Sequence, residues 1–186
     1  MLFGRIGNIF FFLSGLLFKA VNRIKRESGL LQAVRNGLQV GEGTLFVGMQ
    51  HFGSEPYLIR IGCQCLITDG VRFVTHDGGI QVPFIKNGSY IKEVYSNKSL
   101  FGVVEIGDNV FIGVGCIILP NTKISSNSIV AAGSVVKGYF EPDVVIGGNP
   151  AKVICSLEDY YSRNSKKVIE FSDSGSRKLK IMDSIG

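Results

Sequence analysis

The feature of this sequence that most limits its possible folds is an aliphatic residue that returns at every sixth position. The repeat runs through "IGDNVFIGVGCIILPNTKISSNSIVAAGSVVKG" and falls at Ile106, Ile112, Ile118, Ile124, Val130 and Val136. An amphipathic helix repeats its apolar residues about every 3.6 positions, and a half-buried strand about every 2. Because six is a multiple of two, each repeat is consistent with a short strand followed by a turn.

Small and turn-forming residues between the aliphatic positions support this interpretation. They include glycine, asparagine, aspartate and serine, several of which tolerate a positive φ. The fourth residue after an aliphatic position is again of small or modest size: Val110, Cys116, Thr122, Ser128 and Ser134. Each hexad therefore predicts two inward-pointing side chains and one corner of the chain.

Three corners close a triangle, so three hexads predict one turn of a triangular prism. Stacked turns would be separated by the usual strand spacing of about 4.8 Å and would satisfy each other's backbone hydrogen bonds. Residues 18 positions apart should then lie above one another. Val114, Ala132 and Pro150 are predicted to form one such column along an outer edge.

The hexads define the predicted organisation of the chain, whose 186 residues suit one main domain. Residues 1–37 are an apolar and basic helical segment, residues 38–155 the β domain, and residues 156–186 a C-terminal helix and polar tail. The period fails in residues 78–100. Long excursions in compact repeat domains are commonly functional.

The formal net charge of +5 is concentrated at the ends of the chain. Residues 1–40 carry six Lys and Arg against one acid, whereas residues 41–150 carry seven against nine. No nucleic-acid groove is therefore expected along the repeats. The four cysteines form no CxxC pair, which predicts reduced thiols in a cytosolic protein. Two of them, Cys65 and Cys116, occupy small inward positions.

The N-terminus allows two interpretations. The apolar run "IGNIFFFLSGLLF" has 13 residues and is followed by four basic residues, the last of them Arg26. It is shorter than the roughly 20 residues that span a bilayer, and no clear signal-peptide cleavage site follows. Residues 1–26 predict either a helix lying peripherally on the inner face of the cell membrane or a helix packed on the end of the β domain.

The tandem hexads, "AAGSVVKG" and the terminal "GGNPAKVI" resemble the hexapeptide-repeat acyltransferase family over about residues 38–155. The resemblance implies a mainly β fold, a left-handed parallel β-helix with an N-terminal helical segment and a short C-terminal helix. The left hand comes from the resemblance alone, because the general rule favours right-handed crossovers. The stretches "EPYLIRIG" and "VTHDGG" further resemble members that O-acetylate bacterial sugars and surface polysaccharides.

This resemblance implies a cytoplasmic enzyme that uses acetyl-CoA to acetylate a hydroxyl of a sugar or polysaccharide precursor. It also implies a homotrimer with each active site in a cleft between adjacent prisms. The family's catalytic histidine corresponds to His76, whose imidazole would take the proton of the attacking hydroxyl. Asp77 beside it, Asp69 one hexad earlier and a backbone carbonyl all remain candidates for orienting the ring.

The same resemblance implies a set of donor-binding residues. The predicted contacts to acetyl-CoA are Gly113, Val114, Ala132, Gly133, Lys137, Pro150 and Lys152. The two lysines suit the phosphates of the nucleotide as point charges, while the small residues are equally explained by the corners they turn. The sequence departs from the family at Phe111, where Trp is frequent, and at Lys137-Gly138, where Thr-Lys is usual.

Acceptor contacts are predicted at Gln50, His51 and Tyr90, although a structural role explains His51 more simply. The zinc carbonic anhydrases of this fold need three histidine ligands, and the chain has two histidines, so no metal site is predicted. Two alternatives stay open. The acceptor is an amino sugar, serine or an antibiotic, or the protein is a non-catalytic scaffold that tolerates His76→Ala.

Overall fold

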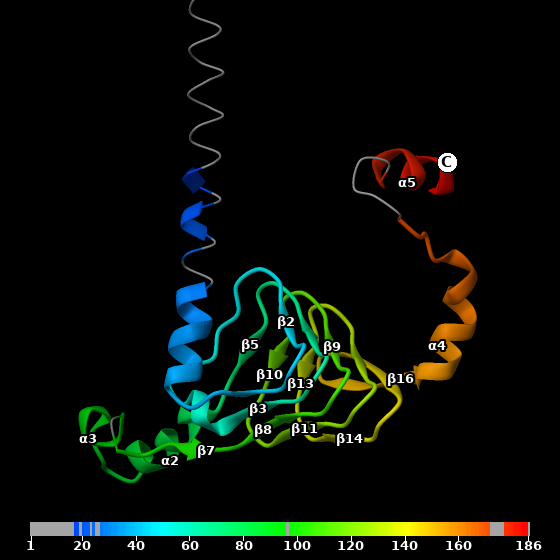
Figure 1. The fold of residues 1–186 in the computed structure, drawn as a ribbon. Coiled ribbons are helices and arrows are strands. Elements are labelled where there is room, and N and C mark those ends of the chain that lie inside the picture. The colour runs from blue at the N-terminus through cyan, green and yellow to red at the C-terminus, as the bar shows by residue number, and fades with distance from the viewer. Residues whose placement is uncertain are drawn as a thin grey trace, which may run out of the picture.

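The chain coils into a three-sided β-helix whose turns stack along one axis (Figure 1). The computed structural model describes residues 17–18, 20–22, 24, 27–95, 97–171 and 177–185. Sheet A contains β1 (Gln39–Val40), β3 (Ile59–Ile61), β8 (Val104–Ile106), β11 (Thr122–Ile124) and β14 (Tyr139–Phe140). Sheet B contains β2 (Leu45–Phe46), β4 (Leu66–Ile67), β9 (Phe111–Ile112), β12 (Ile129–Val130), β15 (Val144–Gly148) and β16 (Ala151–Ser156). Sheet C contains β5 (Arg72–Phe73), β10 (Ile117–Ile118) and β13 (Val135–Val136).

The strands visit sheets A, B and C in turn and pair in parallel with the turns above and below. Ile106 pairs with Ile124, Ile112 with Val130, and Ile118 with Val136. Among the described strands of sheets A to C, β16 alone runs antiparallel, against β15; outside these sheets β6 (His76–Asp77) and β7 (Leu100–Phe101) form a second antiparallel pair. The predicted mainly β fold of stacked parallel hexads is confirmed, while its left hand stays a prediction.

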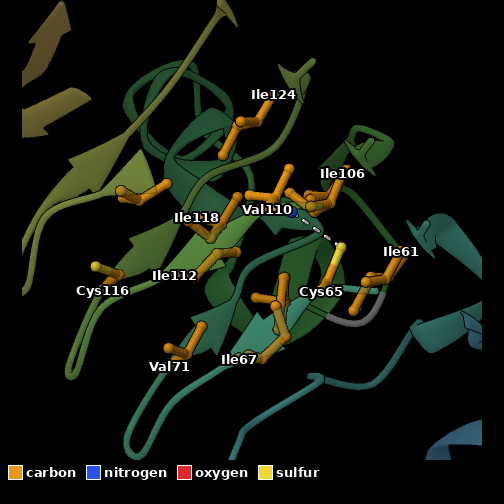
Figure 2. Packing of buried hydrophobic residues seen from close by; sticks show 14 of the residues in the cluster. Ile61, Cys65, Ile67, Val71, Ile106, Val110, Ile112, Cys116, Ile118 and Ile124 are labelled. Carbon is orange, nitrogen blue, oxygen red and sulfur yellow. Dashed lines mark hydrogen bonds between the residues drawn. The ribbon is translucent and has the colours of Figure 1, made fainter. Parts of the chain in front are cut away.

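The interior of the prism is filled by the residues that the hexads predict to point inward. The aliphatic positions from Ile106 to Val136 are 4% exposed or less, as are the small positions from Val110 to Ser134. Figure 2 shows the hydrophobic members of this set that it labels, from Ile106 to Ile124, packed together in the interior. Cys65 and Cys116 are buried among them, as predicted, and burial raises the pKa of both thiols. These two thiols are therefore packing groups and not nucleophiles.

Positive-φ residues stack at two of the corners. The first corner, from sheet A to sheet B, has Gln64, Asn109, Asn127 and Asp143 at φ between 52° and 60°. The second corner, from sheet B to sheet C, has Gly70, Gly115 and Gly133 at φ 71–72°. Asparagine and glycine adopt this left-handed conformation at little cost. Both corners therefore keep the same length in every turn, and each side of the prism holds one hexad.

The third corner, from sheet C to sheet A, varies in length. Register partners are 21 residues apart between the first two turns, 45 across the next, then 18, and finally 16. Three residues are inserted before β3, and two residues are missing before β14. The long insertion before β8, which begins at His76 and ends at Phe101, is called the arm. All departures from the regular period therefore lie at one edge of the prism.

The shortened last turn overturns the predicted column of Val114, Ala132 and Pro150. Val130 pairs with Ile146 and not with a residue 18 positions later. By this register Gly148 lies over Ala132, and Pro150 lies in the turn between β15 and β16. The prediction was wrong because Lys137 and Gly138 turn the third corner with two residues fewer, Gly138 at a φ of 106°.

Helices and the inserted arm surround the prism. Residues 27–35 are helical and contact the core through Leu30 and Ala33, and this helix rises away from the prism (Figure 1). The arm contains β6 (His76–Asp77), η2 (Gly78–Ile80), α2 (Gln81–Lys86), α3 (Ile91–Tyr95) and β7 (Leu100–Phe101). The remaining elements are η1 (Pro56–Leu58), α4 (Leu157–Asn164), η3 (Ser165–Lys167) and α5 (Arg177–Ile185). Within the described part of the chain, no helix has the length and apolarity needed to cross a bilayer.

Candidate active site

The variable third corner gathers the chemistry-bearing side chains of the chain. The three-residue insertion carries Glu55, and the arm begins with His76 one turn later. A hollow of about 330 Å³ opens beside them; we call it the His76 hollow. It is lined by Val74, His76, Asp77, Leu100, Phe101, Leu119, Pro120, Asn121 and Lys137.

The imidazole of His76 is held at one nitrogen by a carboxylate. Nδ1 lies 2.8 Å from Oε2 of Glu55, and the same oxygen accepts the hydroxyl of buried Thr75 at 2.7 Å. The side chain of Glu55 is 15% exposed and that of His76 is 42% exposed. Because an ionised carboxylate only accepts hydrogen bonds, Nδ1 donates, and Nε2 of the neutral ring keeps its lone pair for a group in the hollow.

The surroundings of Glu55 keep it ionised. Partial burial on its own would raise the pKa of this carboxyl, but hydrogen bonds from Thr75, His76 and Ser54 outweigh it, and the pKa is lowered from its usual value. A charged Glu55 is therefore present beside His76 throughout the neutral range. Such a charge stabilises an imidazolium more than a neutral ring, which suits a histidine that gains and loses a proton.

Glu55 is the orienting group that the sequence analysis missed. Asp77 lines the His76 hollow, but its carboxylate accepts from the backbone N–H of Gly79 and begins η2. Asp69 lies at the second corner, where it accepts from the backbone N–H of Met49. These two aspartates lie in the hexad of His76 and in the hexad before it. Glu55 lies 21 residues before His76, in residues 51–57, where the hexad pattern is irregular.

The walls of the His76 hollow come from the arm and from the upper turns. The ring of Phe101 lies 6.1 Å from that of His76, because β6 and β7 pair Phe101 with His76. Leu100 and Phe101 also line a neighbouring hollow of about 380 Å³ against Phe84. Lys137, at the same corner two turns later, also lines the His76 hollow. Sequence analysis did not single out Phe101, although it stands where the arm rejoins the prism.

The predicted donor-binding residues divide between two corners. Gly113, Val114, Ala132 and Gly133 lie at the second corner, where the N–H of Gly133 bonds the carbonyl of Val114. Lys152, on β16, pairs with Gly147 beside this edge and is exposed. Lys137 lies at the third corner with His76. One face of the prism, sheet C, separates the two groups within a single chain.

The predicted acceptor contacts do not line the His76 hollow. Gln50 and His51 line a separate hollow of about 400 Å³ beside the helix of residues 27–35. The amide of Gln50 donates to the carbonyls of Val47 and Thr68. Tyr90 is 75% exposed between α2 and α3. Any contact of these residues with an acceptor therefore stays a prediction.

Comparison with known proteins gives concordant matches. The family model "Bacterial transferase hexapeptide (six repeats)" matches residues 104–138. Protein CapG of Staphylococcus aureus is 44% identical over 139 residues, 74% of each chain. Galactoside O-acetyltransferase of Escherichia coli K12 is 33% identical over 116 residues, 60% of this chain and 53% of that enzyme. The crystal structure of a hexapeptide-repeat containing acetyltransferase from Vibrio cholerae has a TM-score of 0.53 at 21% identity, covering 78% of this chain and 89% of that one, which shows a common fold.

Proposed function

Since the chain belongs to the bacterial hexapeptide-repeat transferase family, we propose that it transfers an acetyl group from acetyl-CoA to a hydroxyl of a sugar or surface-polysaccharide precursor. Galactoside O-acetyltransferase is the related enzyme that supports the reaction class. The observation that carries the proposal is the contact of 2.8 Å between His76 Nδ1 and Glu55 Oε2 beside the His76 hollow. A structural histidine needs neither a charged partner nor an open nitrogen at a cleft.

His76 acts as the general base in the proposed reaction. Its Nε2 takes the proton of the acceptor hydroxyl while that oxygen attacks the thioester carbonyl of acetyl-CoA. Glu55 holds the ring and stabilises the imidazolium that forms. When the carbon–sulfur bond breaks, the imidazolium returns the proton to the leaving thiolate. The acetyl group is then bound to the acceptor as an ester, and no cysteine is acylated.

The second corner supplies the donor edge in this proposal. Val114 and Ala132 are exposed beside the positive-φ glycines, so backbone groups stand open to the amides of a pantetheine arm. Lys152 suits a phosphate of the nucleotide. Because sheet C separates this edge from His76, the donor edge that serves His76 belongs to another copy of the chain, as in the proposed homotrimer.

An apolar column on the outside of sheet B supports self-association. Leu45, Leu66, Phe111 and Ile129 are consecutive register partners and point away from the core, with Leu45 63% exposed. The matching column on sheet A carries an ion pair between Arg60 and Glu105. Native mass measurement tests this assignment. Phe111→Arg should reduce a trimer to monomers, whereas Arg72→Ala on the outside of sheet C should not, because His76 and a partner's donor edge meet only when sheet B of one copy packs on sheet A of the next; a monomeric wild type would refute it.

The N-terminal helix fits peripheral binding to an anionic bilayer. Leu17, Phe18 and Ile24 are each more than 60% exposed, and residues 1–40 carry six basic residues against one acid. Most of the 1–26 segment lies outside the described residues. Co-sedimentation with vesicles containing phosphatidylglycerol should exceed that with pure phosphatidylcholine and should vanish on removal of residues 1–26. Equal sedimentation of both proteins would refute this location.

Titration calorimetry with acetyl-CoA tests the donor half of the reaction. Wild type should bind, Lys152→Ala should bind more weakly, and Lys123→Ala, which removes an exposed lysine from sheet A, should bind as wild type. Acetyl transfer to a sugar panel then tests His76→Ala, with a loss of about 10²–10⁴-fold expected. Binding by wild type with unchanged transfer in His76→Ala would refute the proposed base, and no binding by the folded trimer would favour the scaffold alternative.

A further inference from the structure

The hollow beside the N-terminal helix, here called the His51 hollow, lies next to the catalytic corner. Two of its lining residues, Gly53 and Pro56, flank Glu55 along the chain. A methyl group on Gly53 would lie 3.7 Å from the hydroxyl of Thr75, which bonds the carboxylate that holds His76. The segment from Gly53 to Pro56 therefore connects the lining of the His51 hollow with the carboxylate that holds His76.

Polar groups with open hydrogen-bonding capacity surround the His51 hollow. Among the described residues, neither ring nitrogen of His51 has a hydrogen-bond partner, and its side chain is exposed. Gln50 is fixed by its donated bonds, which leaves its carbonyl oxygen as an acceptor. Asn36 accepts a long bond of 3.5 Å from Gln32, which leaves its amide nitrogen as a donor. Open donors and acceptors around one hollow suit a ligand rich in hydroxyls, because each hydroxyl both donates and accepts.

Gly29 supplies an independent observation. It lines the His51 hollow within the helix of residues 27–35, where glycine is less favourable than alanine. Its φ is not positive, and a Cβ at this position would meet no described atom within 4 Å. Neither the backbone nor the packing of the described chain calls for glycine here. What the missing side chain provides is room in the hollow.

We infer that the His51 hollow binds a second sugar unit of the acceptor, so that the acceptor is a glycan of at least two residues whose acetylated unit lies at His76. This inference rests on the proposed O-acetyl transfer. The insertion that carries Glu55 contacts both units, one on each side. The second unit supplies binding energy remote from the reacting hydroxyl, which an enzyme can use to position that hydroxyl.

Matched acceptor pairs test the inference: galactose with lactose, glucose with maltose, and N-acetylglucosamine with its β-1,4-linked dimer. Release of CoA gives kcat/KM for each member. In wild type the disaccharide of at least one pair should exceed its monosaccharide by about tenfold. Gly29→Ala should bring this ratio close to one while raising Tm, because alanine stabilises the helix. Val34→Ala, an exposed position of the same helix outside the hollow, should keep the wild-type ratio.

The outcomes separate the second sugar site from the reaction itself. A wild-type ratio near one, or an unchanged ratio in both Gly29→Ala and Asn36→Ala, overturns the second sugar site and leaves the acetyltransferase standing. If wild type acetylates no member of the panel above His76→Ala, saturation-transfer NMR with the same disaccharides decides. Binding that is lost in Asn36→Ala then refutes the transfer reaction and supports the glycan site, whereas absence of binding refutes the glycan site.

Discussion

Replacing Glu55 by glutamine removes one negative charge from the site while keeping its shape. The single oxygen Oε2 accepts from both Thr75 and His76, and the amide oxygen of glutamine can accept from both in the same place. The fold and the orientation of the ring are therefore kept, and the variant isolates the effect of the charge on the imidazolium formed during acetyl transfer.

The expected loss of kcat follows from the free energy that a hydrogen bond to a charged group contributes. Hydrogen bonds to charged groups contribute about 1.5–3 kcal/mol and neutral ones about 0.5–1.5 kcal/mol, a difference of about 1–2 kcal/mol. Since about 1.4 kcal/mol corresponds to a factor of ten, kcat should fall about 5- to 30-fold in Glu55→Gln. The KM for acetyl-CoA should change little, because the charge acts on the ring and not on the donor.

The assay is release of CoA followed with a chromogenic disulfide, with His76→Ala and Glu55→Ala alongside. Glu55→Ala should be slower than Glu55→Gln, because it leaves Thr75 and Nδ1 of His76 without an acceptor. A wild-type kcat in Glu55→Gln would refute the role of the charge. So would a loss confined to KM, since that would make Glu55 a contact of the substrate.

The lowered pKa of Glu55 adds a dependence of stability on pH. A carboxyl whose pKa is depressed on folding contributes stability above its unfolded pKa, and this contribution is lost as pH falls through the folded value. Wild type should therefore be more stable than Glu55→Gln at neutral pH, and the gap should narrow below about pH 4. Urea unfolding at neutral and acidic pH measures both gaps. A stability difference between wild type and Glu55→Gln that grows at acidic pH would contradict the lowered pKa of Glu55.

Three further predictions test how the prism is built. Ile118→Ala should lower the free energy of unfolding by about 2–5 kcal/mol, because this fully buried side chain lies between Phe73 and Val136; outward-facing Ile117→Ala should cost about 1 kcal/mol or less. Gly133→Ala should lower the free energy of unfolding by about 1–2 kcal/mol, because alanine is strained at a φ of 71°. Gly113→Ala should lower it further, because the added methyl would lie 2.6 Å from the nitrogen of Ala132. Urea unfolding of the two variants tests this order. Replacing residues 78–99 by an Asn-Gly turn across the pair of β6 and β7 should leave the prism folded, since the arm contributes nothing to the described core cluster. Acetyl-CoA binding should then survive while acceptor transfer is lost, and a collapse of Tm would show the arm to be structural.

The sequence predicts the prism well because the hexad is a local signal. The burial of each aliphatic position is predicted by its own place in the hexad, and every one from Ile106 to Val136 points inward as expected. Stacking is different, because it depends on the number of residues in every preceding corner. Counting in steps of 18 therefore missed the contact of Glu55 with His76, which spans 21 residues. It also misplaced Pro150, where the last step is 16. A period marks what is buried, whereas the lengths of its interruptions decide which side chains meet.

The three corners differ in what they can accommodate. Length changes at the first or second corner would move a side of the prism and expose its aliphatic residues, and both corners are constant in every turn. At the third corner added chain leaves the prism and removes no core contact, so it carries little thermodynamic cost beyond loop closure. Three of the four crossings at this corner use this freedom: a short insertion brings Glu55, a long one brings His76 and Phe101, and, after one regular crossing, a two-residue shortening brings Lys137 to the same hollow. The site therefore stands where the fold constrains the chain least, and Glu55 and His76 are held by their own contact, by the hydroxyl of Thr75 and by the pairing of β6 with β7.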